Sequence, residues 1–120
     1  MFKFIEKSTL AQLITEQTDE ARSYLLIDCR EPHEFSSTEL PHLPTALNIP
    51  LKCITSNFSE LTSTQFLSQY GLEKPCHHDP IIIYCRSGAR AQKAAQEMID
   101  LGYENVYVYK GSANEWWGKV

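Results

Sequence analysis

The sequence lacks the features that would assign it to several large classes of protein. Its apolar runs are only a few residues long, whereas a membrane-spanning helix needs roughly 20 such residues. Lys and Arg total 11 against 15 for Asp and Glu, and the net charge of −4 without a basic run disfavours nucleic acid as a partner. The chain has no internal repeat and no segment of low complexity. We therefore expect a protein that binds neither nucleic acid nor membrane.

Cysteine is present, but not in the spacing of a zinc knuckle. The four cysteines, Cys29, Cys53, Cys76 and Cys85, include no CxxC pair. Two histidines follow Cys76, but the sequence shows no clear second group of ligands that would complete a metal site. Residues 1–7 have no long apolar core of the kind found in a secretory signal peptide. We therefore expect no bound metal, and reduced thiols in a cytoplasmic protein.

The length and the apolar pattern indicate one α/β domain over residues 1–120. A chain of 120 residues with 42% apolar residues is the size of one ordinary domain. Strand-like and helix-like segments alternate, which is typical of a mostly parallel sheet. The expected strands are 2–5, 24–28, 46–48, 81–84 and 106–109. The expected helical segments are 8–16, capped by Ser8, then 31–35, 63–70, 89–101 and 114–117, with a polar loop at 17–23 and a capping box formed by Thr62 and Gln65.

Cys85 stands where the most apolar strand ends and a helix begins, which is where ligands bind in open α/β sheets. Gly88 permits a positive φ, so the N–H groups of the loop can point towards one anion. Arg86, Arg90 and the helix N-terminus add positive charge. All these features favour the thiolate form of Cys85. They should lower its pKa below the value of about 8.5 that is usual for a cysteine thiol. The pattern predicts a nucleophilic cysteine; the alternative is a buried apolar filler.

The segment from Cys85 to Arg90 resembles the active-site loop of the rhodanese (thiosulfate sulfurtransferase) family. Three other segments are also similar to that family: 26–35, with Asp28, Arg30 and the following Glu-Pro; 43–50; and the stretch from Gly102 to Trp116. The likeness spans about residues 5–117. It implies a single rhodanese-like domain, in which a five-stranded, mostly parallel sheet has helices on both faces. Where the family usually has glycine, this chain has Pro41, Thr45 and Ser112, so we expect altered loop shapes at those positions.

The resemblance implies a thiosulfate sulfurtransferase that needs no cofactor. Cys85 would take the outer sulfur of thiosulfate as a persulfide and pass it to a thiol such as glutathione or thioredoxin, or to cyanide. Arg86 and Arg90 would orient the sulfonate of the donor. Backbone N–H groups at Ser87, Gly88 and Ala89 would bind the persulfide. The resemblance further implies that Asp28 and Arg30 support the loops around the site, although a surface ion pair is the plainer interpretation.

Two other functions remain open from the residues. A persulfide carrier or docking module that hands sulfur to a protein partner would keep the same loop. A phosphatase or arsenate reductase of related fold would need five residues between the cysteine and the arginine, and this loop has four. We expect Cys29 to be a core thiol. Cys76 is a candidate for resolving the persulfide as a disulfide, and the resemblance leaves a mitochondrial location open beside the cytoplasmic one.

Overall fold

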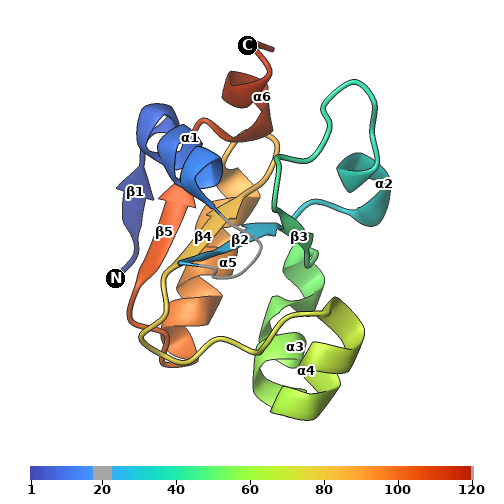
Figure 1. The fold of residues 1–120 in the computed structure, drawn as a ribbon, viewed down its shortest axis with the longest axis vertical. Coiled ribbons are helices and arrows are strands. Elements are labelled where there is room, and N and C mark those ends of the chain that lie inside the picture. The colour runs from blue at the N-terminus through green and yellow to red at the C-terminus, as the bar shows by residue number, and fades with distance from the viewer. Residues whose placement is uncertain (18–22, 120) are drawn as a thin grey trace.

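The computed structural model describes residues 1–17 and 23–119, and its centre is a five-stranded sheet (Figure 1). The strands are β1 (Lys3–Ile5), β2 (Leu25–Asp28), β3 (Leu47–Asn48), β4 (Ile81–Tyr84) and β5 (Val106–Tyr109). Their order is β1-β5-β4-β2-β3, and every neighbouring pair is parallel. The expected parallel α/β fold is confirmed. Because all strands run the same way, their carboxyl ends meet at one edge.

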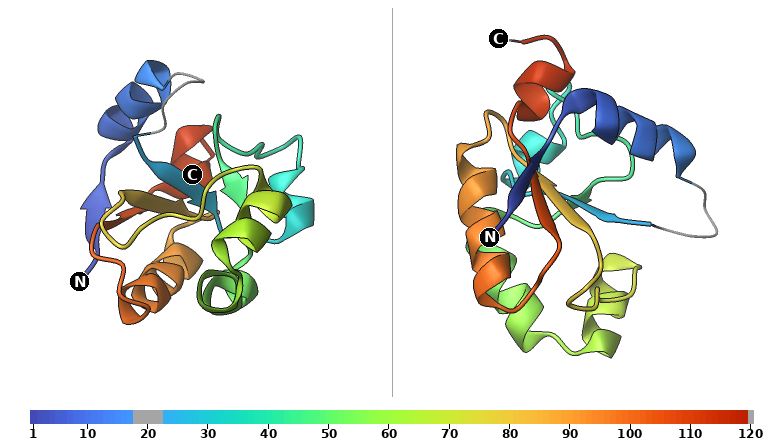
Figure 2. Two further views of the ribbon diagram at one scale, coloured as in Figure 1. Left: turned by 60° about the horizontal axis from the view of Figure 1, so that its bottom comes forward. Right: turned by 90° about the vertical axis from the view of Figure 1, so that its left-hand side faces the viewer.

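Helices cover both faces of this sheet. They are α1 (Lys7–Glu16), α2 (Pro32–Phe35), α3 (Ile54–Glu60), α4 (Ser63–Tyr70), α5 (Ala89–Asp100) and α6 (Ser112–Trp116), with a short 3-10 turn, η1 (Leu51–Cys53). Figure 2 shows α1 and α5 on opposite sides of the sheet. The apolar clusters agree with this view, since α3, α4 and α5 share one cluster and α1 and α6 share the other.

The central strand β4 divides its side chains between the two clusters. Ile81 and Ile83 pack with α3, α4 and α5, whereas Ile82 and Tyr84 pack with α1 and α6. All four are buried, as expected for a strand covered on both faces. Cys85 follows in the same alternation and belongs to the α5 side. The strand therefore places the sulfur between the sheet edge and the start of α5.

The predicted caps and ends of the helices are confirmed in part. Thr62 and Gln65 form the expected capping box, and α4 ends at Gly71, whose φ is 75°. Ser8 was expected to cap α1, but that is wrong: the helix begins at Lys7 with Glu6 at its N-cap. The turn η1 and helix α3 were not expected from the sequence. The polar loop expected at 17–23 lies mostly outside the described residues.

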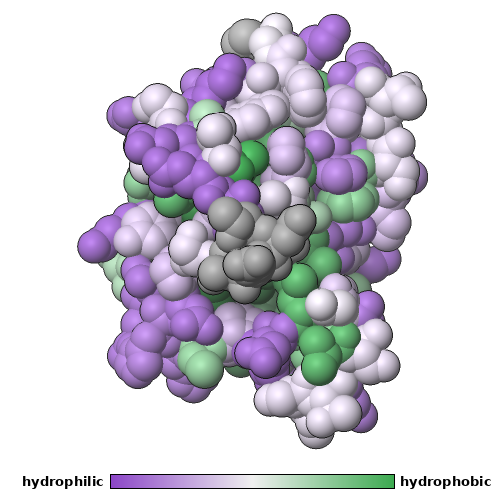
Figure 3. Space-filling model, in the orientation of Figure 1, coloured by the Kyte–Doolittle hydropathy of each residue, from purple (hydrophilic) through white to green (hydrophobic). Residues whose placement is uncertain are grey.

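The surface of the molecule mixes polar and apolar side chains. Figure 3 shows hydrophilic residues spread over the face seen in Figure 1, with hydrophobic ones gathered towards the lower right, in the region of α3 and α4. Among the described residues, no helix combines the length and apolar character that crossing a membrane requires.

Candidate active site

The carboxyl ends of β2, β4 and β5 bring the candidate site together. Asp28 ends β2, Cys85 follows β4, and Ser112 lies just beyond β5. Since β4 lies between β5 and β2, Cys85 is at the centre of the group. The backbone N–H of Cys85 donates a 3.2 Å hydrogen bond to the hydroxyl of Ser112, which ties the two loops together.

The sulfur of Cys85 is held as an anion. The residue is only 1% exposed, and the N–H of Gly88 donates to its Sγ at 3.0 Å. The pKa of Cys85 is lowered to about 5, chiefly by the neighbouring Cys29 thiol acting as a hydrogen-bond donor. Burial acts in the opposite direction, and the backbone N–H groups of Ala91, Gly88 and Ser87 lower the pKa further. At neutral pH the thiolate therefore predominates.

Gly88 is required at its place in the loop. Its φ is 103°, a backbone conformation that residues with a Cβ rarely adopt. A Cβ built on Gly88 would lie 2.3 Å from the carbonyl oxygen of Lys110. The loop thus passes too close to the end of β5 for any side chain here. This close passage aims the Gly88 N–H at the sulfur.

Arg90 is engaged by a carboxylate of the protein itself. Its Nη1 and Nη2 donate to Oε1 and Oε2 of Glu34 at 2.7 and 3.0 Å, a two-pronged contact between α5 and α2. The guanidinium of Arg90 holds the pKa of Glu34 at about 2. The family resemblance implies that Arg90 orients the donor's sulfonate; in the structure its guanidinium contacts Glu34. Arg86, the other arginine of the loop, is exposed.

Asp28 and Arg30 form a buried pair and not the surface pair considered from the sequence. They are 0% and 1% exposed, and Arg30 Nη2 donates to Asp28 Oδ2 at 2.7 Å. The Nε of Arg30 also donates to Asp28, and its Nη1 donates to the carbonyl oxygen of Leu40 at 2.9 Å. The pair thereby fixes the loop after α2 to the end of β2.

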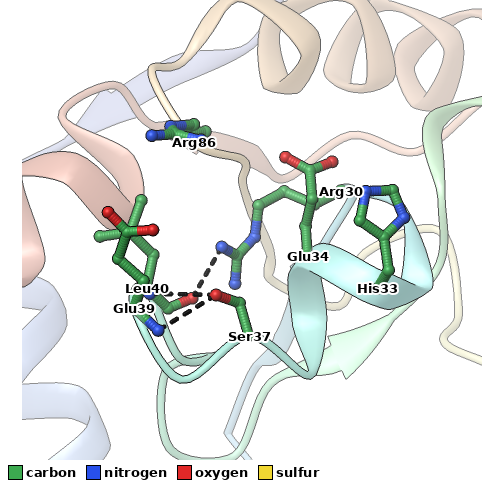
Figure 4. Close-up of a pocket in the computed structure, with 7 residues that line it drawn as sticks. All are labelled: Arg30, His33, Glu34, Ser37, Glu39, Leu40 and Arg86. Atoms are coloured by element: carbon green, nitrogen blue, oxygen red, sulfur yellow. Dashed lines mark hydrogen bonds between the residues drawn. The ribbon is translucent and has the colours of Figure 1, made fainter.

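A pocket of about 260 Å³ lies beside the cysteine loop (Figure 4). Figure 4 shows Arg86 above it, with Glu39 on one side and Glu34 and His33 on the other. The guanidinium of Arg30 points towards its centre. The pocket thus offers both positive and negative groups to a small ligand.

Ser112 lies at the site, although the sequence predicts only an altered loop shape at this position. It is fully buried, its φ is 56°, and its hydroxyl donates to the carbonyl of Tyr109 at 2.8 Å. The same oxygen lies 4.0 Å from Cys85 Sγ. Thr45, the second departure, has a φ of 69°. At both positions the backbone therefore adopts the conformation that glycine favours.

The other cysteines occupy contrasting positions. Cys29 is buried, as expected of a core thiol, and the neighbouring Cys85 together with burial raises the pKa of its thiol. Cys76 is exposed in the loop that precedes β4, whereas Cys85 follows the other end of the strand. The length of β4 alone separates the two by roughly 13 Å. Within residues 1–17 and 23–119, no three His, Cys, Asp or Glu side chains are grouped as a metal site.

The arrangement of Cys85 between a parallel strand and a helix start is typical of α/β proteins whose nucleophile is a cysteine thiolate. The chain belongs to the rhodanese-like domain family, whose model matches residues 8–119. It is 36% identical over 92 residues to the thiosulfate:glutathione sulfurtransferase of Saccharomyces cerevisiae, covering 77% of this chain and 63% of that protein. It is 35% identical over 95 residues to the mitochondrial thiosulfate sulfurtransferase RDL2 of the same yeast, covering 79% and 61%.

Among solved structures, the fold is similar to that of the human single-domain sulfurtransferase TSTD1. The TM-score is 0.83 and the sequence identity 26%, with 100% of this chain and 99% of that chain covered. The chain spans less than two thirds of the length of the two yeast proteins, but nearly all of the human one.

Proposed function

We propose that this protein is a thiosulfate sulfurtransferase that carries sulfur as a persulfide on Cys85. The observation that carries the proposal is the buried thiolate, with its pKa lowered to about 5 and its sulfur 3.0 Å from the N–H of Gly88. A thiolate is the form of cysteine that attacks sulfur. The names of the two yeast relatives support thiosulfate as the donor, and the name of the human neighbour supports sulfur transfer in general.

In the first step, Cys85 Sγ attacks the outer sulfur of thiosulfate. An S–S bond forms to the enzyme, and the bond between the two sulfurs of thiosulfate breaks, so that sulfite leaves with the bonding electrons. The persulfide anion occupies the space towards which the N–H groups of Ser87, Gly88 and Ala91 point, and Ala89 begins the helix whose N-terminus favours negative charge there.

The two arginines of the loop have different roles in this proposal. Arg86 is exposed and lines the pocket, so it binds the sulfonate of the donor. Arg90 fixes the loop through its contact with Glu34 and contributes charge at longer range. Asp28 and Arg30 support the loop on the other side of the pocket through their buried ion pair.

The acceptor in the second step is a small thiol, with glutathione as the first choice. The pocket offers Arg86 to a carboxylate and Glu39 to an ammonium group, and glutathione carries both. One of the yeast relatives is named for glutathione. Thioredoxin and cyanide are the other acceptors to compare. For the compartment we propose the cytoplasm or the mitochondrion, the latter because one relative is named mitochondrial.

The test is the intact mass of the reduced protein after incubation with thiosulfate. The wild type should gain one sulfur atom, which cyanide or glutathione removes, and Cys85→Ser should gain none. Cys76→Ser is the matched control because Cys76 is exposed at the opposite edge of the sheet. A wild type that neither gains sulfur nor releases sulfite from thiosulfate contradicts the proposal. A single transfer that small thiols cannot turn over would favour the carrier function instead.

A further inference from the structure

Cys29 stands directly opposite Cys85 at the edge of the sheet. In the parallel ladder of β2 and β4, Asp28 pairs with Tyr84. The N–H of Cys29 donates to the carbonyl oxygen of Tyr84 at 3.0 Å, which continues that ladder by one residue. The next pair in the register is therefore Cys29 with Cys85.

The register brings the backbones of Cys29 and Cys85 to the separation that a disulfide spans. Both side chains belong to the cluster on the α5 side of the sheet, and each residue is only 1% exposed. Neighbouring strands lie about 4.8 Å apart, within the roughly 4.4–6.8 Å range of Cα separations found in disulfides. An S–S bond between these cysteines thus needs little movement of the backbone. Within the described residues, no other cysteine stands opposite Cys85 in this register.

The protonation states of the two sulfurs suit such a reaction. The hydrogen bond to Cys85 and burial raise the pKa of Cys29, so this residue keeps its proton while Cys85 is an anion. A thiol beside an anionic sulfur is a proton donor at short range. After the first step of transfer, the proton of Cys29 faces a persulfide anion.

We propose that Cys29 is a second catalytic cysteine, which resolves the persulfide of Cys85 within the chain and releases the outer sulfur as hydrosulfide. This step depends on the proposed function, because the persulfide has to form first. The thiol proton of Cys29 moves to the outer sulfur. Cys29 Sγ then bonds to Cys85 Sγ, and the bond from Cys85 Sγ to the outer sulfur breaks, so that HS⁻ leaves with the electron pair.

The step needs no external oxidant. Two thiol sulfurs are oxidised to a disulfide, and the transferred sulfur takes up the two electrons and becomes sulfide. Two equivalents of a small thiol then reduce the Cys29–Cys85 disulfide by exchange and return the enzyme to its starting state. The enzyme accordingly has two products: a thiol persulfide when an acceptor reaches the outer sulfur first, and hydrosulfide when Cys29 reacts first.

The experiment loads the protein with one sulfur, removes excess donor, and follows it anaerobically in buffer without thiol. Thiosulfate is one donor. Inorganic polysulfide is the other, so that loading does not depend on the proposed activity. We expect stoichiometric release of hydrosulfide and a chain lighter than the reduced protein by two hydrogen atoms. Peptide mapping should join Cys29 to Cys85.

Cys29→Val should keep its added sulfur and lose the release of hydrosulfide, whereas Cys53→Ser and Cys76→Ser should behave as the wild type. Circular dichroism checks that each variant is folded. A wild type that retains the persulfide, or a disulfide mapped to another cysteine, overturns the assignment even if Cys29→Val is unstable. If polysulfide loads Cys85 with sulfur and thiosulfate does not, the result contradicts the proposed function but not the role of Cys29.

Discussion

At the scale of single residues, the state of the Cys85 sulfur governs reactivity. Because only the thiolate attacks and the pKa is lowered to about 5, the rate of alkylation by iodoacetamide should rise with pH, reach half its maximum near that value, and be level at neutral pH. The alkylation rate of an ordinary cysteine would still be rising near pH ~8.5. The rapid reaction should be absent in Cys85→Ser, which isolates it from the other thiols.

The neighbouring thiol sets part of this pKa. Cys29 is the largest cause of the lowered pKa of Cys85, so Cys29→Val should move the half-maximal rate to higher pH. Valine fills a similar apolar space and donates no hydrogen bond. An unchanged profile in this variant would mean that the backbone N–H groups suffice to stabilise the thiolate.

The contact between Glu34 and Arg90 makes the stability of the protein depend on pH in acid. The pKa of Glu34 is lowered from 4.5 to about 2 by Arg90. Since the folded protein holds this proton less tightly than the unfolded chain, the contact stabilises above pH ~4.5 and is lost as the pH falls towards 2. Glu34→Gln should therefore lower the free energy of unfolding by about 1 kcal/mol at pH 7 and by less in acid. Urea unfolding at several pH values measures the difference, and a constant difference would contradict the assignment.

At the scale of elements, the turn from β4 into α5 depends on one glycine. In Gly88→Ala the Cβ would meet the carbonyl oxygen of Lys110 at 2.3 Å, and the residue would have to hold a φ of 103°. We expect the loop to shift, persulfide formation to be lost, and stability to fall by more than about 1 kcal/mol. Thiosulfate turnover and urea unfolding measure the two effects.

Gly71→Ala is the matched control for this prediction. Gly71 has a φ of 75° at the end of α4, but a Cβ there meets nothing within 4 Å. The control should lose about 1 kcal/mol of stability through strain and keep its activity. Equal activity losses in the two variants would show that strain and not the position of the loop is responsible.

The elements could be predicted where their signals are local. The capping box of Thr62 and Gln65 marks the start of α4, and the apolar run of β4 marks a strand buried on both faces. Helix α3 gives no such signal: only Ile54 and Phe58 are buried in it, and its N-cap side chain makes no hydrogen bond. Its position is fixed by packing against α5, which the local sequence does not record.

At the scale of the whole molecule, the site is made by segments that are distant in the sequence. The loop from Cys85 to Arg90 could be found from its own residues. The contact of Arg90 with Glu34 joins positions 56 apart, and Cys29 meets Cys85 only through the register of β2 and β4. No local pattern carries that information, because it depends on the order of strands in the sheet. The fold therefore brings together Arg90 with Glu34, and Cys29 with Cys85, although nothing in the local sequence links the members of either pair.

The buried pair of Asp28 and Arg30 links that long-range assembly to stability. Removing Arg30 leaves the carboxylate of Asp28 buried without its partner and frees the carbonyl oxygen of Leu40. Arg30→Met should therefore cost about 3–5 kcal/mol, a large share of the roughly 5–15 kcal/mol that stabilises a domain. Urea unfolding gives the value. The double variant with Asp28→Asn should lose less than the sum of the two single changes, since no buried charge is then left unpaired. Additive losses would show that the two side chains act independently, and that Arg30 holds the loop after α2 through the carbonyl oxygen of Leu40 without help from Asp28.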